Sequence, residues 1–428
     1  MKNKIFYLIV LILTISNGQV NTYSPYSYFG IGQLYHINNT TNISMAGLGV
    51  TLLNQYSLNL VNPSSYSSLK QTSFDIGFSS SFLELTKENL NQKNFVSSLS
   101  NLSLGFPISE KIGVAFALLP YSRVGYNVVN EDLSNDETGL ITSRHTGSGG
   151  LNRFLFGVGT QIIKSLSIGI NFNYIFGPIN RENDIFTQNS NTEFKEINLL
   201  TINDGNFDFA MLFTHLINDY NIHIGTTFCP KTTLKGNSSL FQHTYITSGN
   251  YESFLDTIMY LDNNAVEMTL PSNYSVGIGV GLKNNWFIGL DYKHTKWDEY
   301  HITTEDDNNY LHNQNQFIVG GWVIPKETDI HNYFNRVKYR FGISYTTGYL
   351  NLGDFHESGG GNDILQDLSI STGLALPINK VKSKINLGLR YGLRDSFQSD
   401  LNNIKEKYFD IYFSITLNEK WFKKRKIE

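Results

Sequence analysis

The chain has 428 residues, of which 16% are charged and 14% aromatic, and its net charge is −4. Soluble domains carry about 25% charged residues, so few charges and many Tyr and Phe residues indicate a surface that is not wholly in water. The small net charge gives no case for nucleic-acid binding. A single cysteine, Cys229, excludes an internal disulfide.

Residues 1–18 have the layout of a secretory signal peptide. Lys2 and Lys4 precede an apolar run from Ile5 to Ile15, and small polar residues follow it. The run is too short for a helical membrane span, and no later stretch reaches the roughly 18 apolar residues that such a span needs. We therefore expect an exported protein, cleaved near Gly18, without a helical anchor.

Residues 19–70 form a polar leader rich in Asn, Ser, Tyr and Gly. If the strands that follow close into a barrel, such a leader either hangs free or plugs the lumen. Gly47, Gly49 and Pro63 supply the bends and close backbone approaches that a plug needs. We predict a plug, and an ordinary N-terminal loop is the alternative.

From residue 72 onward, apolar residues alternate with small or polar ones. In INLGLRYGLR, which starts at Ile385, the apolar residues share one face of a strand, and Asn, Gly and Arg share the other. Alternation over eight or more residues predicts strands rather than helices. About fourteen segments show this pattern: 72–85, 97–108, 111–127, 139–162, 166–177, 196–215, 220–230, 272–283, 285–298, 314–325, 335–347, 364–377, 383–396 and 407–421.

The links between these segments differ in length in a regular way. The short links are 107–111, 163–165, 217–220, 283–285 and 377–382. The longer, polar links that alternate with them are 86–95, 129–139, 178–194, 230–271, 298–313, 348–363 and 396–406. Short turns at one end of the strands and long loops at the other are typical of outer-membrane barrels, whose closed sheets satisfy every backbone group without an edge.

We therefore predict an all-β fold, a transmembrane antiparallel β-barrel of about 14 strands over residues 71–422. The barrel would lie in the outer membrane of a Gram-negative bacterium, with its oily faces against the lipid bilayer and its long loops outside the cell. The basic residues 423–428 would form a periplasmic tail. Tyr408 to Leu417, an aromatic-rich last strand, suits recognition by the barrel-assembly machinery that inserts such proteins.

Aromatic side chains gather near the ends of the predicted strands. They are Trp286, Tyr292, Trp297, Tyr300, Trp322, Tyr412 and Trp421. Aromatics at strand ends form the interface girdles of outer-membrane barrels, so this set supports a membrane location and says nothing about cargo.

Two regions carry a family resemblance. Residues 45–69, MAGLGVTLLNQYSLNLVNPSSYSSL, contain a Gly-Leu-Gly run and, about a dozen residues later, Asn62, Pro63 and Ser64. This spacing, and the later strands NYSVGIGVGLKNNWFIGLDYKHTKWDEY and RVKYRFGISYTTGYL, resemble the FadL-type outer-membrane transporters of hydrophobic compounds. Ser64 stands where that family usually has Ala in its Asn-Pro-Ala segment. The start SPYSYFGIGQL looks like a Bacteroidota branch of such barrels.

The resemblance implies that residues 19–70 fold into the barrel as an N-terminal hatch. It also bears on Pro120, which interrupts the predicted strand 111–127 and cannot donate a ladder hydrogen bond there. The third strand of the FadL-type family carries an inward kink that opens a side door into the membrane, and Pro120 is similarly placed. A lateral gate is one interpretation, and a bulge near the membrane rim without a transport role is the other.

Five arginines occupy strand positions that alternation assigns mostly to the lumen: Arg123, Arg153, Arg340, Arg390 and Arg394. Lumenal cations could attract the carboxylate of an amphiphile while apolar hatch residues hold its tail. The alternative is that each arginine pairs with an acid such as Asp75, Asp208 or Asp291 and only rigidifies a polar interior.

The sequence gives no indication of an enzyme. The ten histidines are dispersed without metal-ligand spacing, and the Gly-x-Ser-x-Gly motif is absent, so we predict no catalytic residue, metal site or cofactor. We predict passive uptake of hydrophobic or amphiphilic, fatty-acid-like small molecules. The alternatives are a general diffusion porin and a non-transporting accessory or plug subunit of a larger outer-membrane secretion machine.

Overall fold

The computed structural model describes residues 22–35, 37–133, 139–248, 251–282, 285–304, 310–352, 363–378, 382–396 and 404–421. The predicted signal peptide, 1–18, and the basic tail, 423–428, lie outside these residues. Within them, no helix is long and apolar enough to cross a membrane.

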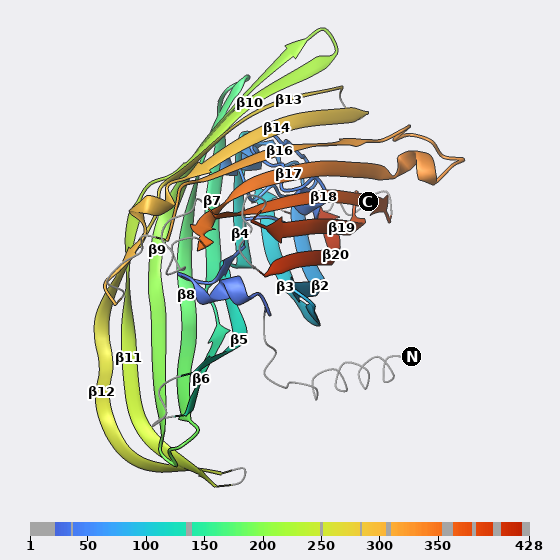
Figure 1. Ribbon diagram of the computed structural model, residues 1–428. Helices are drawn as coiled ribbons and strands as arrows, with labels where there is room; N and C mark the ends of the chain where they lie inside the picture. The colour runs from blue at the N-terminus through green and yellow to red at the C-terminus, as the bar shows by residue number, and fades with distance from the viewer. Residues whose placement is uncertain are drawn as a thin grey trace, which may run out of the picture.

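The described strands form one closed antiparallel barrel of 14 strands, five of which are interrupted and so comprise two segments each (Figure 1). In chain order the strands are β2 (Thr72–Lys87), β3 (Leu90–Pro107), β4 (Ile112–Pro120) with β5 (Ser122–Leu133), β6 (Leu140–Gly149) with β7 (Asn152–Ile163), β8 (Leu166–Thr187), β9 (Glu193–Ile217), β10 (Tyr220–Cys229) with β11 (Thr232–Ser248), β12 (Tyr251–Leu270) with β13 (Asn273–Leu282), β14 (Trp286–Thr295) with β15 (His301–Ile302), β16 (Gln314–Val323), β17 (Lys338–Asn351), β18 (Ile364–Pro377), β19 (Lys384–Asp395) and β20 (Lys405–Glu419). The first and last strands, β2 and β20, pair from Thr72↔Glu419 to Thr86↔Lys405 and so close the barrel.

Shorter elements precede and connect these strands. Ahead of β2 lie η1 (Pro25–Tyr28), β1 (Gln33–Leu34), α2 (Thr40–Ile43) and η2 (Pro63–Ser68). Between barrel strands lie η3 (Trp297–Glu299) and η4 (Phe334–Arg336).

The barrel strands carry their apolar residues on the outside. In β19, Leu387, Leu389 and Tyr391 are 36%, 41% and 54% exposed, whereas Asn386 between them is 1% exposed. The alternation predicted from INLGLRYGLR is therefore confirmed, with the apolar face outward and the polar face toward the lumen. A surface of this kind is suited to lipid rather than to water.

Part of the wall bends away from the barrel along a line that runs across the strands, and most of the strands are interrupted where they meet this line. The line passes through Tyr121, the Gly149–Leu151 corner, Gly177 and the two prolines Pro230 and Pro271. Gly149 and Gly177 have φ angles of +99° and +143°, which side chains with a Cβ rarely adopt. Beyond this line, residues 122–133, 140–149, 178–187, 193–202, 232–248 and 251–270 continue as a six-stranded sheet made from β5, β6, β8, β9, β11 and β12. We call this sheet the extension, and Figure 1 shows it curving away from the direction of β14, β16 and β17.

The extension corrects the prediction of long loops. Residues 230–271, predicted as the longest loop, form the paired strands β11 and β12, and most of 178–194 and 86–95 also belongs to strands. These stretches lack regular alternation because water contacts both of their faces over much of their length, so neither face needs to be apolar. Pairing with neighbouring strands holds them in place.

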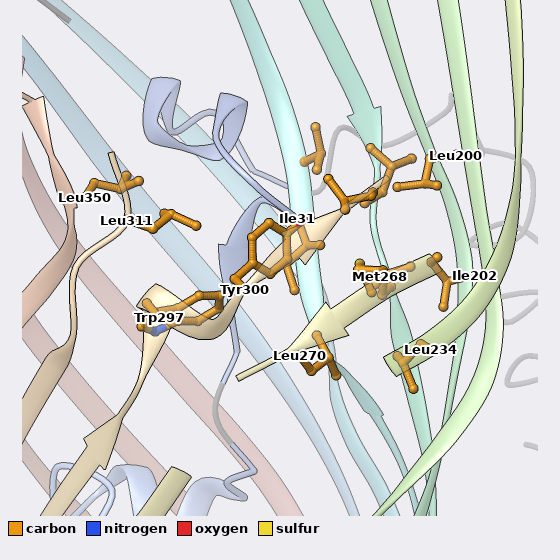
Figure 2. Close-up of a cluster of buried hydrophobic side chains, with 14 of the residues drawn as sticks. Ile31, Leu200, Ile202, Leu234, Met268, Leu270, Trp297, Tyr300, Leu311 and Leu350 are labelled. Atoms are coloured by element: carbon orange, nitrogen blue, oxygen red, sulfur yellow. The ribbon is translucent and has the colours of Figure 1, made fainter. Parts of the chain in front are cut away.

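A hydrophobic cluster lies where the extension meets the barrel. Figure 2 shows Leu200, Ile202, Leu234, Met268 and Leu270 of the extension facing side chains from other walls and from the N-terminal segment. The facing residues are Ile31, Trp297, Tyr300, Leu311 and Leu350. We call these ten residues the cap cluster. The prediction that Trp297 and Tyr300 belong to an interface girdle is wrong, because they are only 5% and 4% exposed within this cluster.

Candidate functional site

Residues 39–69, which we call the hatch, lie against the inner wall of the barrel. Gly113, Gly159 and Gly169 are successive cross-strand partners on β4, β7 and β8. A Cβ on any of these glycines would overlap the backbone of Pro63, Ser64 or Tyr66 in η2. The glycines therefore allow backbone-to-backbone contact between hatch and wall, which a larger residue would prevent.

A second group of glycines receives the other end of the hatch. Gly320 and Gly342 are cross-strand partners on β16 and β17, and a Cβ on Gly320 would lie 2.7 Å from the carbonyl oxygen of Met45. Met45 is fully buried and packs with Leu48 in a small apolar cluster. The hatch thus touches two parts of the wall and spans the lumen between them.

Asn62, Pro63 and Ser64 stabilise the internal structure of the hatch. Asn62 is fully buried and caps η2, because its Oδ1 accepts a hydrogen bond from the backbone N–H of Ser64 at 3.0 Å. Its Nδ2 donates to the carbonyl oxygen of Val50 at 2.6 Å. The Ser64 hydroxyl also donates to Asn62 Oδ1, at 2.5 Å. Ser64 therefore adds a hydrogen bond that Ala could not make.

Asp291 on β14 anchors the hatch to the wall. Its Oδ2 accepts hydrogen bonds from the backbone N–H groups of Gly49 and Val50, each at 2.8 Å, and the residue is 2% exposed. Sequence reasoning considered Asp291 only as a partner for an arginine. The signal that could have found its role is the single carboxylate of β14, at an inward position opposite Gly277.

A cavity of about 350 Å³ lies between the hatch and the cap cluster. Ala46, Val50 and Val61 line it from the hatch, and Leu270 and Trp297 line it from the cap cluster. Its wall carries both charge signs, with the cations Arg153, Lys293, Arg390 and Arg394 and the acids Asp208, Asp291, Asp367, Glu406 and Asp410. The cavity is therefore amphiphilic rather than purely apolar.

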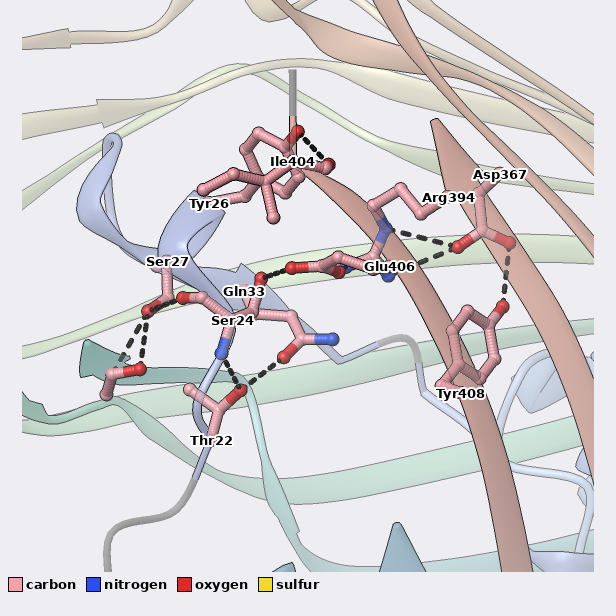
Figure 3. Close-up of polar contacts among 12 residues, drawn as sticks. Thr22, Ser24, Tyr26, Ser27, Gln33, Asp367, Arg394, Ile404, Glu406 and Tyr408 are labelled. Carbon is pink, nitrogen blue, oxygen red and sulfur yellow. Dashed lines mark hydrogen bonds and ion pairs between the residues drawn. The ribbon is translucent and has the colours of Figure 1, made fainter. Parts of the chain in front are cut away.

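Two of the predicted arginines form ion pairs beside this cavity. Arg390 Nη2 lies 2.6 Å from Asp410 Oδ2. Arg394 lies 2.7 Å from Glu406 and 3.1 Å from Asp367 (Figure 3). The predicted partners Asp75, Asp208 and Asp291 are wrong for these two arginines, because Asp410, Glu406 and Asp367 lie on neighbouring strands at matching heights.

The same ion-pair cluster ties the N-terminal segment to the wall. The hydroxyl of Ser24 donates to Glu406 Oε1 at 2.5 Å, and Tyr26 donates to the carbonyl oxygen of Ile404 at 2.5 Å. On the other side, Tyr408 donates to Asp367 at 2.7 Å (Figure 3). Ser24 and Tyr26 are therefore fixed to Glu406 and Ile404, whereas Gln33 and Leu34 pair with β5.

The other three predicted arginines are placed differently. The Arg153 guanidinium lies 4.5 Å from the ring centre of Tyr121, at the edge of the cavity. Arg340 is 2% exposed and donates to Asn386 at 3.1 Å. Arg123 donates to Asn152 at 3.4 Å. The structure therefore brings Arg153, Arg390 and Arg394 to one cavity and leaves Arg123 and Arg340 in other contacts.

Pro120 lies beside a split in the barrel wall. It is the last residue of β4 and pairs with Asn152 of β7. The pairing of β3 with β4 extends no further than Leu102↔Leu118. Among the described residues, no ladder joins the rest of β3 to β5. Pro120 and Val96 of β3 both line the cavity, so the cavity reaches the wall where its strands separate.

Comparisons with known proteins identify a family and a shared fold. The BamG family model matches residues 1–428. Similar solved structures include the CymD monoaromatic hydrocarbon channel (12% identity, 92% of this chain and 99% of that one, TM-score 0.57). A Pseudomonas aeruginosa FadL homologue is also similar, with 10% identity over 90% of this chain and 98% of that one and a TM-score of 0.57. The Pseudomonas putida toluene transporter TodX has 15% identity over 90% of this chain and 98% of that one, with a TM-score of 0.57. No curated protein sequence matches the chain. At these identities the structural likeness shows the shared barrel fold.

Proposed function

We propose, from the premise that this chain belongs to the BamG family, that it is an outer-membrane barrel which takes up small amphiphilic molecules passively. The observation that carries this proposal is the amphiphilic cavity of about 350 Å³ between hatch and cap cluster, next to the split at Pro120. Two proteins of the same fold, the CymD monoaromatic hydrocarbon channel and the toluene transporter TodX, carry hydrophobic compounds, which supports the proposal. The placement of the chain in a Bacteroidota branch stays a prediction.

In this proposal the hatch closes the lumen toward the periplasm, and the molecule moves between the cavity and the membrane through the split near Pro120. Arg153 would attract an anionic head group, since its guanidinium lies over the Tyr121 ring and, among the described residues, makes no ion pair with a carboxylate within 4 Å. Arg390 and Arg394 are already paired with acids, so they would shape the cavity rather than bind cargo. In this proposal Pro120 ends β4 next to the split through which the molecule leaves.

The test is native mass spectrometry of the full chain purified in detergent, with lipid extraction of whatever co-purifies. The informative variant is Val96→Asn, which puts an amide into the cavity wall. The matched control is Val129→Asn on the extension, where the side chain is 50% exposed. We expect a bound amphiphile in the wild type and in the control, and a several-fold lower bound fraction in Val96→Asn. Wild-type protein without bound amphiphile would contradict the proposal.

A second candidate function is that of a non-transporting accessory subunit of a larger outer-membrane machine. One observation favours it: the hatch is held in place by buried hydrogen bonds that the backbone N–H groups of Gly49 and Val50 donate to Asp291. Native electrophoresis after mild solubilisation separates the candidates, since this one predicts a stable complex with a larger barrel and an empty cavity. A ligand-loaded monomer would contradict it.

A further inference from the structure

The far end of the extension carries an exposed aromatic and acidic surface, which we call the tip patch. It consists of Phe241 of β11 and Glu252, Phe254, Tyr260 and Asp262 of β12. Phe254 and Tyr260 are 58% and 62% exposed. The ring of Phe241 lies 6.5 Å from that of Phe254 and 5.9 Å from that of Tyr260. Large exposed apolar side chains gathered in one place mark interaction surfaces in soluble regions.

The tip patch lies outside the band of the barrel that faces lipid. The partner strands β10 and β13 each supply ten residues before the bend at Pro230 and Pro271, which is the length that crosses a bilayer as a strand. Phe241 follows Thr232, the first residue of β11, by roughly 30 Å along the strand. Lipid therefore does not explain the exposed rings.

The tip patch occupies the sheet face opposite to the cap cluster. Leu234 and Ser238 of β11 point to the cap side, so alternation places Phe241 on the other side. The pairing of Phe241 with Tyr260 and of Tyr245 with Phe254 puts those rings on the same face. Asp262 joins them, because the hydroxyl of Ser239 donates to its Oδ1 at 2.9 Å.

A partly exposed ionic cluster lies on this face. Lys195 Nζ of β9 lies 2.7 Å from Glu252 and 3.5 Å from Asp184, and its side chain is only 12% exposed. It also lies 4.8 Å from the ring centre of Tyr245. Rings that are fixed before binding lose little conformational entropy when a partner covers them.

The free edge of β12 is a less suitable binding feature than this face. Three register shifts interrupt the pairing of β11 with β12, at Ser238/Leu240, Gln242/His243 and Thr244/Tyr245. Bulges of this kind protect exposed edges against strand addition. A partner is therefore expected to contact side chains of the tip patch rather than to extend the sheet.

We propose that the tip patch docks a second protein through a basic, arginine-bearing surface. Charge complementarity selects this occupant: the tip patch exposes the acids Glu252 and Asp262, and the nearby cation Lys195 is only 12% exposed and already paired with Glu252 and Asp184. A guanidinium can stack on Tyr260 while it pairs with Asp262. A second copy of this chain would bring the same acids and repel, and an anionic lipid surface would repel as well. This inference holds whether or not the lumen carries cargo.

The test uses the full chain in the cells that make it, with a photo-crosslinking amino acid at Tyr260. The matched position is Phe334, which is 68% exposed in the connection at the opposite end of the strands. We expect one protein to be crosslinked from Tyr260 and not from Phe334, through a peptide that contains Arg or Lys. The yield of this crosslinked product should decrease about tenfold in the Asp262→Lys variant. It should also decrease in 1 M salt, because salt screens the attraction between the charges.

The control for charge is Asp219→Lys in the exposed turn between β9 and β10, which should leave the product unchanged. Asp262 is exposed, so Asp262→Lys should keep the folded barrel's mobility on unheated gels. The proposal is overturned by no product from Tyr260, by a product with a second copy or with lipid alone, or by a product that Asp262→Lys does not reduce.

Discussion

The barrel and the extension are made from the same strands, yet different interactions stabilise them. In the barrel half of β9, Phe207, Phe209 and Met211 face outward at 45–47% exposure, as lipid requires. In the other half, Lys195 makes ion pairs with Asp184 of the neighbouring strand β8 and with Glu252 of β12, which lies beyond β11. A strand with lipid on one face and a polar lumen on the other must alternate apolar and polar residues. A strand with water on both faces has no such requirement, and strand pairing and local side-chain contacts hold it in place.

The largest expected effect concerns the ion pairs of the barrel. Arg394→Met removes the partner of Glu406, whose side chain is fully buried, and an uncompensated buried charge costs about 3–5 kcal/mol. Urea unfolding in detergent should show this loss of unfolding free energy. Arg394→Met combined with Glu406→Gln removes the charge and should recover most of it. A double variant as unstable as the single one would argue against the ion pair as the cause.

The next effect concerns the contact between hatch and wall. Gly159→Val puts side-chain atoms into the backbone of Pro63, and overpacking against backbone costs about 3 kcal/mol. Because the hatch must move away, we also expect a higher conductance in a planar bilayer. Thr160→Val, on the next residue and the opposite face of β7, is the control. Unchanged conductance in Gly159→Val would mean that the hatch does not close the lumen.

A smaller effect is expected in the extension. Lys195→Met removes the ion pairs with Glu252 and Asp184, and pairs open to water on one side contribute only about 1 kcal/mol. Hydrogen exchange of the amides of β11 and β12 should accelerate by roughly fivefold, while exchange in β19 stays the same. A loss of free energy as large as that in Arg394→Met would contradict the expectation that ion pairs stabilise the extension less than the barrel.

The smallest effect is a pH dependence of the extension. Burial, helped by the charge of Lys195, lowers the pKa of His243 below its ordinary value. Below the unfolded pKa of about 6.5, the unfolded segment binds more protons than the folded one, so local stability falls as the pH drops. Exchange rates corrected for intrinsic chemistry, compared at pH 7.5 and 5.5, measure this. His243→Gln should abolish the pH dependence, and an identical dependence in that variant would exclude His243 as its source.

The sequence was sufficient to predict the barrel and its number of strands, because lipid imposes alternation that can be read directly. It was insufficient for the extension, since 230–271 contains polar residues on both faces and reads as a loop. It also could not assign partners to the arginines. Arg390 and Arg394 pair with Asp410 and Glu406 through strand register, and the register between two strands is not visible in the sequence of either strand alone.

The candidate site, like the fold, was predictable only in part from the sequence. Gly47, Gly49 and Pro63 indicated a compact leader, and the structure places the region around them against wall glycines. The anchor Asp291 was not foreseen as such, because its partners are backbone N–H groups that carry no side-chain signature. The split beside Pro120 depends on where the β3–β4 ladder ends, which the proline alone does not determine.

The unbroken course of β8 and β9 through the bend has a mechanical consequence. β9 runs for 25 residues from Glu193 to Ile217, which is roughly 80 Å of continuous strand. The strands beside it are interrupted at the same height, between β10 and β11 at Pro230 and between β12 and β13 at Pro271. A load at the tip of the molecule is therefore carried by β8 and β9, and β8 includes Gly169, which touches the hatch. A displacement of the extension would therefore be transmitted along these two strands to the part of the wall that contacts Pro63 and Ser64.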